Sequence, residues 1–145
     1  MTTLQQAVAV GKAESQLAVI ATLRADGTIQ SSLVNAGAIA HPRTGEPVLA
    51  FVTYGRVKLA NLRPRPQLTA TFRSGWQWAT IEGHADIAGP DDPQPWLAAA
   101  ELPALLRKIF TAAGGSHDDW DEYDRVMTEQ RRAAVLVTPS RVYTN

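Results

Sequence analysis

Alternation of apolar and polar residues dominates the middle of the chain and predicts half-buried antiparallel strands there. Residues 67–72 place three apolar side chains on one face and three polar ones on the other. Residues 76–88 continue the alternation, and their core-like face carries Ala79, Ile81, Ala85 and Ile87. Two tryptophans, Trp76 and Trp78, share the opposite, polar face. Large exposed aromatic residues of this kind usually mark an interface.

Short apolar runs that contain β-branched residues predict further strands at 17–24, 48–53 and 133–143. The pair Asp26-Gly27 is the strongest hairpin signal in the chain. It predicts that one strand over 29–39 returns antiparallel beside the first strand.

Helical periodicity is confined to short stretches, which are predicted at 3–12, 57–63, 96–110 and 118–130. Pro64 ends the second stretch, because proline disfavours helical geometry at the residue before it. Pro103 interrupts the third and can open a new helix. About six mostly antiparallel strands with peripheral helices predict an α+β fold built on a Greek-key-like or partly open barrel. No linker divides the chain, so residues 1–145 are expected to form a single domain.

Composition narrows the classes of function. Lys plus Arg and Asp plus Glu number 14 each, so no net field favours nucleic acid or an anionic membrane as a partner. The absence of cysteine excludes disulfides and thiolate chemistry. No long apolar run indicates a signal peptide or a membrane span, and the expected location is the cytoplasm. Any function that depends on positive charge must therefore be local.

One local cluster of charge follows the predicted strand 48–53. Thr53 is followed by Gly55, Arg56 and Lys58 at the predicted start of a helix. A hydroxyl, a glycine that permits close approach, free backbone N–H groups and two cations suit an anion, and phosphate fits best. Because Arg56 and Lys58 are two residues apart, both reach one ligand only if Arg56 still lies in the turn. Two solvated surface cations are the alternative interpretation.

No catalytic or metal-binding set accompanies this corner. His41, His84 and His117 lack metal-ligand spacing and are interpreted as surface or structural residues. The acidic run 118–124 lacks the central glycine of a calcium loop and is interpreted as a solvated helix start. No Gly-x-Ser-x-Gly motif supports a hydrolase. We therefore assign neither a catalytic residue nor a metal site from the sequence.

Several short motifs follow one another in a fixed order. The first is the hairpin AVIATLRADGTIQSS, and the next segment is FVTYGRVKLANLRPRPQLTATF, followed by WQWATIEGHADI. They contain an R-x-K cluster, an N-L-R-x-x-P helix end and an E-G-x-A strand. With these motifs, residues 17–87 resemble the pyridoxamine 5'-phosphate oxidase-like split-barrel flavoproteins, and especially their actinobacterial branch that uses the deazaflavin coenzyme F420.

This resemblance implies a split β-barrel that binds F420 and transfers a hydride between the deazaflavin and a small organic substrate. Two alternatives stay open, namely an FMN-binding oxidoreductase of the same fold and a non-catalytic carrier of F420 or flavin. Both cofactors would present a phosphate to the same corner. The resemblance also implies a homodimer with the cofactor in a groove between two protomers, and the paired tryptophans agree with such an interface.

The resemblance further implies which residues bind the cofactor, and these are Arg56, Lys58, Thr53, Val52, Gln30, Ser31, Ser32, Asn61, Trp76 and Trp78. The two cations would hold the phosphate beside the Thr53 hydroxyl and the Val52 backbone. The Gln-Ser-Ser strand would lie under the ring system, and the tryptophans near the cofactor or the partner subunit. Asn61 is interpreted as a helix-capping or loop-bracing residue more than as a ligand. The pair Gln77-Trp78 replaces the Arg-Gln pair of the flavin-phosphate oxidases, which argues against a true pyridoxamine phosphate oxidase.

Overall fold

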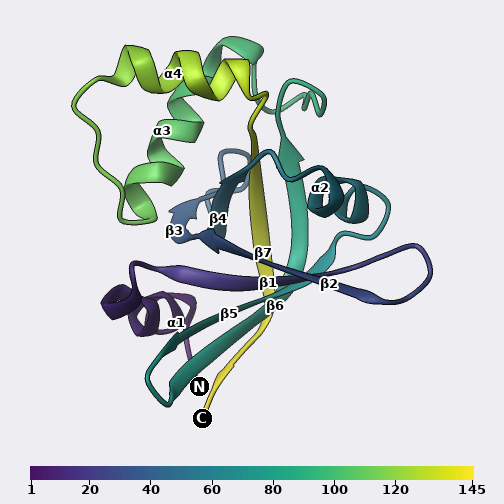
Figure 1. Cartoon of the computed structure of the whole chain (residues 1–145), viewed down its shortest axis with the longest axis vertical. Helices are drawn as coiled ribbons and strands as arrows, with labels where there is room; N and C mark the ends of the chain where they lie inside the picture. The colour runs from purple at the N-terminus through teal and green to yellow at the C-terminus, as the bar shows by residue number, and fades with distance from the viewer.

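Seven strands form one antiparallel sheet in the computed structural model, which describes residues 1–145 (Figure 1). They are β1 (Leu17–Leu23), β2 (Ile29–Asn35), β3 (Gly37–Ala40), β4 (Pro47–Thr53), β5 (Gln67–Ser74), β6 (Gln77–Ala88) and β7 (Ala133–Thr144). Their order in the sheet is β2-β1-β5-β6-β7-β4-β3. Because only Ala36 separates β2 from β3, the two outermost strands of this order are linked through one residue. The sheet therefore closes into a split barrel.

Side chains from alternate strand positions fill the barrel. In β5 and β6, Phe72 faces Ala79 and Ala70 faces Ile81 across the ladder, and all four are fully buried. The alternation predicted for these two strands is thus confirmed. The predicted hairpin at Asp26-Gly27 is confirmed as well, because β1 and β2 pair antiparallel on either side of it.

The prediction of one continuous strand over 29–39 is wrong. Ala36 is fully buried, and its N–H donates to the Gln16 carbonyl at 3.1 Å instead of continuing a ladder. Gly37 then packs against the carbonyl of Ala112, so closely that a Cβ atom at this position would clash with it. The chain passes from one edge of the sheet to the other at this point. The sheet therefore has seven strands where the sequence predicted about six.

Four α-helices accompany the sheet, namely α1 (Leu4–Gly11), α2 (Arg56–Leu62), α3 (Leu102–Ala112) and α4 (Trp120–Glu129). The side chain of Thr3 caps α1 by accepting a hydrogen bond of 3.1 Å from the Gln6 N–H. Figure 1 shows α1 near both termini and α3 with α4 at the opposite end. None of these helices has the length and apolar character needed to cross a membrane.

Helix α1 and the pair α3–α4 cover different parts of the sheet. Leu4, Ala7 and Val8 of α1 join the apolar core inside the barrel. A second apolar cluster lies between α3, α4 and the outer face of β3, β4 and β7. Its fully buried side chains include Ile109 of α3 and Leu136 of β7. This second layer forms one wall of the candidate site.

The helix predicted over 96–110 begins later than expected. Glu101 accepts a hydrogen bond of 2.9 Å from the Ala98 N–H, and a short 3-10 turn leads into α3. Pro103 lies near the start of α3, as predicted. Trp96 is not helical and instead packs against the ring of His41, with the ring centroids 4.9 Å apart. A tertiary contact thus holds Trp96 outside the helix.

Candidate functional site

The predicted phosphate corner borders a cavity of about 470 Å³. Its walls come from the end of β2, the β4–α2 corner, α3, α4 and the residue before β7. Val52, Thr53 and Lys58 line it, as do Leu33 and Arg132. Small-molecule sites commonly have volumes of roughly 300–1,000 Å³. We call this space the Lys58 cavity.

Lys58 is a buried cation without an acidic partner. Its side chain lies in α2 and the residue is only 6% exposed. The ammonium lies 5.7 Å from the centroid of the Phe51 ring, and no carboxylate acts on it. Burial lowers the pKa of Lys58 below its ordinary value. A buried charge of this kind is costly unless a ligand of opposite charge compensates it.

Arg132 is a second cation on the same cavity. Its guanidinium carbon lies 4.1 Å from the centroid of the Tyr54 ring, and its Nε donates to Gln130 at 2.8 Å. No carboxylate pairs with it, and burial lowers its pKa. Sequence reasoning missed this residue, because Arg131 and Arg132 are adjacent and chemically identical. Arg131 instead pairs with Asp91 at 2.5 Å.

Arg56 does not join Lys58 at the cavity. Helix α2 begins at Arg56, one residue earlier than predicted, so Arg56 no longer lies in the turn. Side chains at positions i and i+2 of a helix point in different directions. Lys58 is accordingly buried, whereas Arg56 is exposed and outside the cavity lining. The structure thus separates the two predicted cations and brings Arg132 to Lys58 instead.

Thr53 and Gly55 shape the cavity beside Lys58. Thr53 Oγ1 accepts a hydrogen bond of 3.0 Å from the Gly55 N–H, which leaves the hydroxyl proton free to donate. A Cβ atom at Gly55 would lie 3.2 Å from Thr53 Oγ1 and 3.6 Å from Lys58 Cε. A side chain at this position would crowd the space next to the ammonium. The glycine therefore keeps the corner open to a ligand.

Asn61 braces α2 against the sheet instead of lining the cavity. Its Nδ2 donates to Thr22 Oγ1 in β1 at 3.0 Å, and both residues are buried. Thr22 in turn donates to Gln30 Oε1 in β2 at 3.1 Å. This chain of side-chain hydrogen bonds fixes the helix that carries Lys58. Two of the predicted site residues, Gln30 and Asn61, thus lie at its two ends.

The serines of β2 differ in their environments. Ser31 is exposed on the outer face of the strand. Ser32 has a buried Oγ atom that has no hydrogen-bond partner. It lies two residues before Val34, on the same face of the strand, and Val34 lines the Lys58 cavity. A buried hydroxyl without a partner is uncommon in native proteins and suits a site where a ligand completes the bond.

The structure places Trp76 and Trp78 at the β5–β6 hairpin, outside the cavity lining. Trp76 is 95% exposed, and Trp78 packs edge-on against Tyr143 with ring centroids 6.1 Å apart. The side chain of Asn145 donates to the Trp76 carbonyl at 2.9 Å and accepts from the Trp78 N–H at 3.1 Å. Within one chain, the tryptophans therefore do not meet Lys58.

The buried histidine is structural. His41 Nδ1 accepts a hydrogen bond of 3.1 Å from the Arg43 N–H, so the proton of the neutral ring lies on Nε2. Nε2 donates to Asp86 at 2.9 Å.

His117 Nδ1 accepts from the Asp119 N–H at 2.9 Å at the start of α4. No group of three or more His, Cys, Asp or Glu residues is arranged to hold a metal ion.

No family model matches the sequence. The fold is similar to that of a conserved protein, Rv2991, from Mycobacterium tuberculosis, with a TM-score of 0.68 and 17% identity over 99% of this chain and 84% of the other. It is also similar to an F420 reductase, with a TM-score of 0.64 and 18% identity over 99% and 98% of the two chains.

A third similar structure is a pyridoxamine 5'-phosphate oxidase-related, FMN-binding protein from Nostoc punctiforme. It matches with a TM-score of 0.63 and 15% identity over 95% of this chain and 79% of the other. The likeness extends over nearly the whole chain in all three cases. The chain therefore has the fold of the pyridoxamine 5'-phosphate oxidase-like split-barrel proteins, as the sequence resemblance predicted.

Proposed function

We propose that this protein is an oxidoreductase that binds coenzyme F420 at the Lys58 cavity and transfers a hydride between the deazaflavin and a small organic substrate. The observation that carries the proposal is the pair of cations, Lys58 and Arg132, that line one cavity without any carboxylate partner. Such a pair is suited to a phosphate. The likeness to an F420 reductase supports a phosphate that belongs to a flavin-type cofactor.

The residues of the cavity fit a phosphate by their donor chemistry. Lys58 and Arg132 would donate charge-assisted hydrogen bonds, and the hydroxyl group of Thr53 would supply a third donor. Gly55 leaves room for the group to approach. Ser32 lies outside the cavity lining, and its unpartnered hydroxyl would meet a part of the cofactor beyond the phosphate. When bound, the deazaflavin itself supplies the hydride chemistry. The chain is asked chiefly to bind and orient the cofactor, so we assign no catalytic acid or base.

The predicted ligands outside the cavity lining remain part of the proposal. Gln30 and Ser31 lie on the strand whose end borders the cavity. Arg56 lies exposed at the start of α2, directly after Tyr54 and Gly55, which line the cavity. These residues would contact the parts of a cofactor that extend beyond the phosphate.

We further propose that the functional unit is a homodimer. The outer face of β1 and β2 carries exposed apolar side chains, which are Leu17, Val19, Ile29 and Leu33. Val19 and Leu33 are direct neighbours across the two strands and are 47% and 59% exposed. Leu33 also lines the Lys58 cavity. A second copy on this face would bury the apolar side chains and complete the cavity wall, and Trp76 and Trp78 would gain a surface to contact.

FMN is the second candidate cofactor, because a structure of the same fold is an FMN-binding protein. Titration of the purified apoprotein with F420 and with FMN, followed by cofactor fluorescence, separates the two. We expect saturable binding of F420 and, when the reduced cofactor F420H2 is supplied, hydride transfer that oxidises it to F420 and reduces a quinone, enone or tetrapyrrole acceptor. Tight binding of FMN without any binding of F420 would overturn the cofactor assignment. Binding without turnover of any of these acceptors would favour the carrier function.

A further inference from the structure

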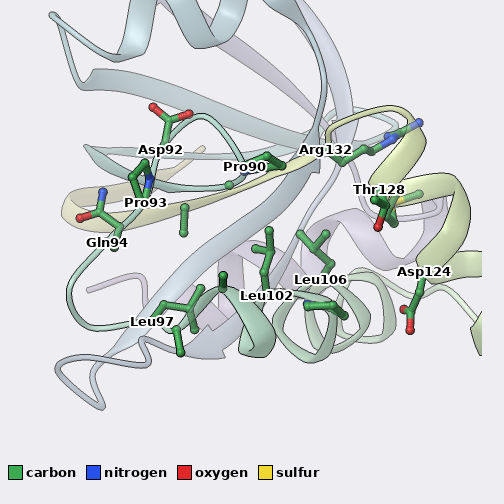
Figure 2. A pocket seen from close by; sticks show the side chains of 16 residues that line it. Pro90, Asp92, Pro93, Gln94, Leu97, Leu102, Leu106, Asp124, Thr128 and Arg132 are labelled. Carbon is green, nitrogen blue, oxygen red and sulfur yellow. The ribbon is translucent and has the colours of Figure 1, made fainter.

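A second cavity, of about 300 Å³, lies against the first. Its walls are the loop after β6, the start of α3 and one side of α4 (Figure 2). In Figure 2, Leu102 and Leu106 of α3 point toward Pro90 of the loop. Met127 and Arg132 line both this space and the Lys58 cavity. We call the second space the loop cavity.

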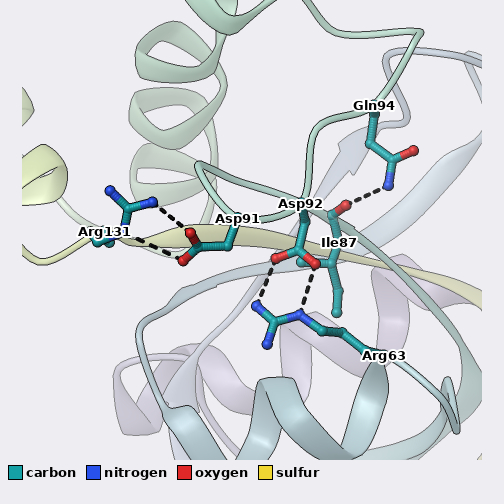
Figure 3. A network of polar contacts seen from close by, with 6 residues as sticks. All are labelled: Arg63, Ile87, Asp91, Asp92, Gln94 and Arg131. Carbon is teal, nitrogen blue, oxygen red and sulfur yellow. Dashed lines mark hydrogen bonds and ion pairs between the residues drawn. The ribbon is translucent and has the colours of Figure 1, made fainter.

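The wall formed by the loop is anchored at several points (Figure 3). Asp91 accepts a hydrogen bond of 2.5 Å from Arg131, which precedes β7. Gln94 Nε2 donates to the Ile87 carbonyl of β6 at 2.8 Å. Asp92 contacts Arg63, the residue that follows α2. Because these contacts reach three different elements, the loop cavity is formed by a fixed wall and needs no rearrangement to exist.

The charges around the loop cavity leave one cation without a partner. Asp92 accepts two hydrogen bonds from Arg63, both 2.8 Å long. Asp124 likewise accepts from Arg107, with a Nε–Oδ1 distance of 2.9 Å. Both carboxylates are therefore already neutralised by arginines from outside the cavity. Arg132 is the remaining charged group of the lining, and no carboxylate pairs with it.

We propose that the loop cavity binds an apolar organic anion, such as an aromatic carboxylate or sulfonate. The apolar part would lie among Leu97, Leu102 and Leu106, and the acidic group would meet Arg132. Binding of the anion follows from this cavity alone. Its role as a substrate beside the cofactor rests on the proposed function. Since Arg132 faces both cavities, occupation of one changes the affinity of the other, and the change is reciprocal.

Anilinonaphthalene sulfonate is a suitable probe, because it is an aromatic anion whose fluorescence rises in apolar surroundings. We expect saturable binding to the full chain with a single class of site. Ala99 lines the cavity but is exposed, so Ala99→Trp fills the opening without disturbing the core. Thr128→Trp does the same from α4. Each of these changes, and Arg132→Gln, should weaken dye binding about tenfold or more.

Arg125→Gln is the matched control for the charge change. Arg125 pairs with Glu122 and Glu129 on the exposed side of α4 and does not line the cavity. Its loss should leave dye binding unchanged. Undiminished binding in both tryptophan variants and in Arg132→Gln would overturn the proposal, and so would the absence of saturable binding to the wild-type chain.

Lys58→Met separates the two sites. We expect this variant to lose affinity for F420 or FMN and to bind the dye as the wild type does. The reverse pattern, in which Lys58→Met loses the dye and Ala99→Trp retains it, would place the dye in the Lys58 cavity and refute the inference. Failure of both cofactors to bind, with the expected dye pattern intact, would refute the proposed function and leave the loop cavity as an anion site.

Discussion

Asn61 in α2 donates a hydrogen bond of 3.0 Å to Thr22 Oγ1 in β1, and both side chains are buried. This contact ties the helix that carries Lys58 to the first strand of the barrel. Gln30 extends the chain on the far side of Thr22. The position of the buried ammonium therefore depends on a polar network that is satisfied within the protein.

Removal of one partner of this pair should destabilise the fold. Asn61→Ala leaves the Thr22 hydroxyl without its donor in a buried position, and the free energy of unfolding should fall by about 1–3 kcal/mol. Urea denaturation measures the change. The single variants Asn61→Leu and Thr22→Val each remove one polar group, and the double variant removes both. The double variant should lose less free energy of unfolding than the sum of the losses in these two single variants. Strictly additive losses would show that the two side chains do not interact.

The buried ammonium of Lys58 should make the stability of the apoprotein depend on pH. Burial lowers the pKa of Lys58 below its ordinary value of 10.5. Between the lowered pKa and 10.5, the unfolded chain binds more protons than the folded chain. The buried charge of Lys58 therefore lowers the free energy of unfolding most below this window. The free energy of unfolding recovers as the pH rises through it.

Lys58→Met should abolish that rise, because methionine fills the same space without a charge. Urea unfolding of the wild type and the variant at a series of alkaline pH values gives the difference. Burial also raises the pKa of Tyr123, which lowers stability as the pH rises above 10.0. This opposing contribution is present in both proteins and cancels in the difference. Two parallel pH profiles would mean that the Lys58 ammonium is not buried in solution.

The exposed pair Val19 and Leu33 should hold the proposed dimer together. Leu33→Glu would place a charge in the centre of the apolar face, and we expect a shift from dimer to monomer in sedimentation experiments. Val57→Glu is the control, because Val57 is also an exposed aliphatic residue but lies on α2. A monomeric wild-type chain, or a Leu33→Glu variant that stays dimeric, would contradict this interface.

Most strands of the barrel could be predicted, because buried apolar residues and exposed polar residues alternate along them. The division of β2 from β3 could not, since Val34, Ala36 and Ala38 continue the same apolar period across Asn35 and Gly37. The ladder breaks where Ala36 contacts Gln16, twenty residues earlier in the chain, and where Gly37 packs against Ala112, far later in it. A one-dimensional pattern does not contain such a contact.

Part of the candidate site could also be predicted from the sequence. The order Thr53, Gly55, Lys58 is local, so a strand end with a cation beside it could be anticipated. The helix start decided which cation turned inward, and that boundary differed by one residue from the prediction. Arg132 could not be distinguished from Arg131, because only the tertiary contacts of the two arginines differ.

The affinity of F420 for Lys58→Met, compared with the wild type, tests the central claim most directly. If the buried ammonium holds the phosphate, its loss should weaken binding by about 1.5–3 kcal/mol, or about ten- to a hundredfold. Lys108→Met is the control, because Lys108 is exposed on α3 and lies outside the Lys58 cavity, and it should bind as the wild type does. A Lys58→Met variant that binds F420 as tightly as the wild type would contradict the account.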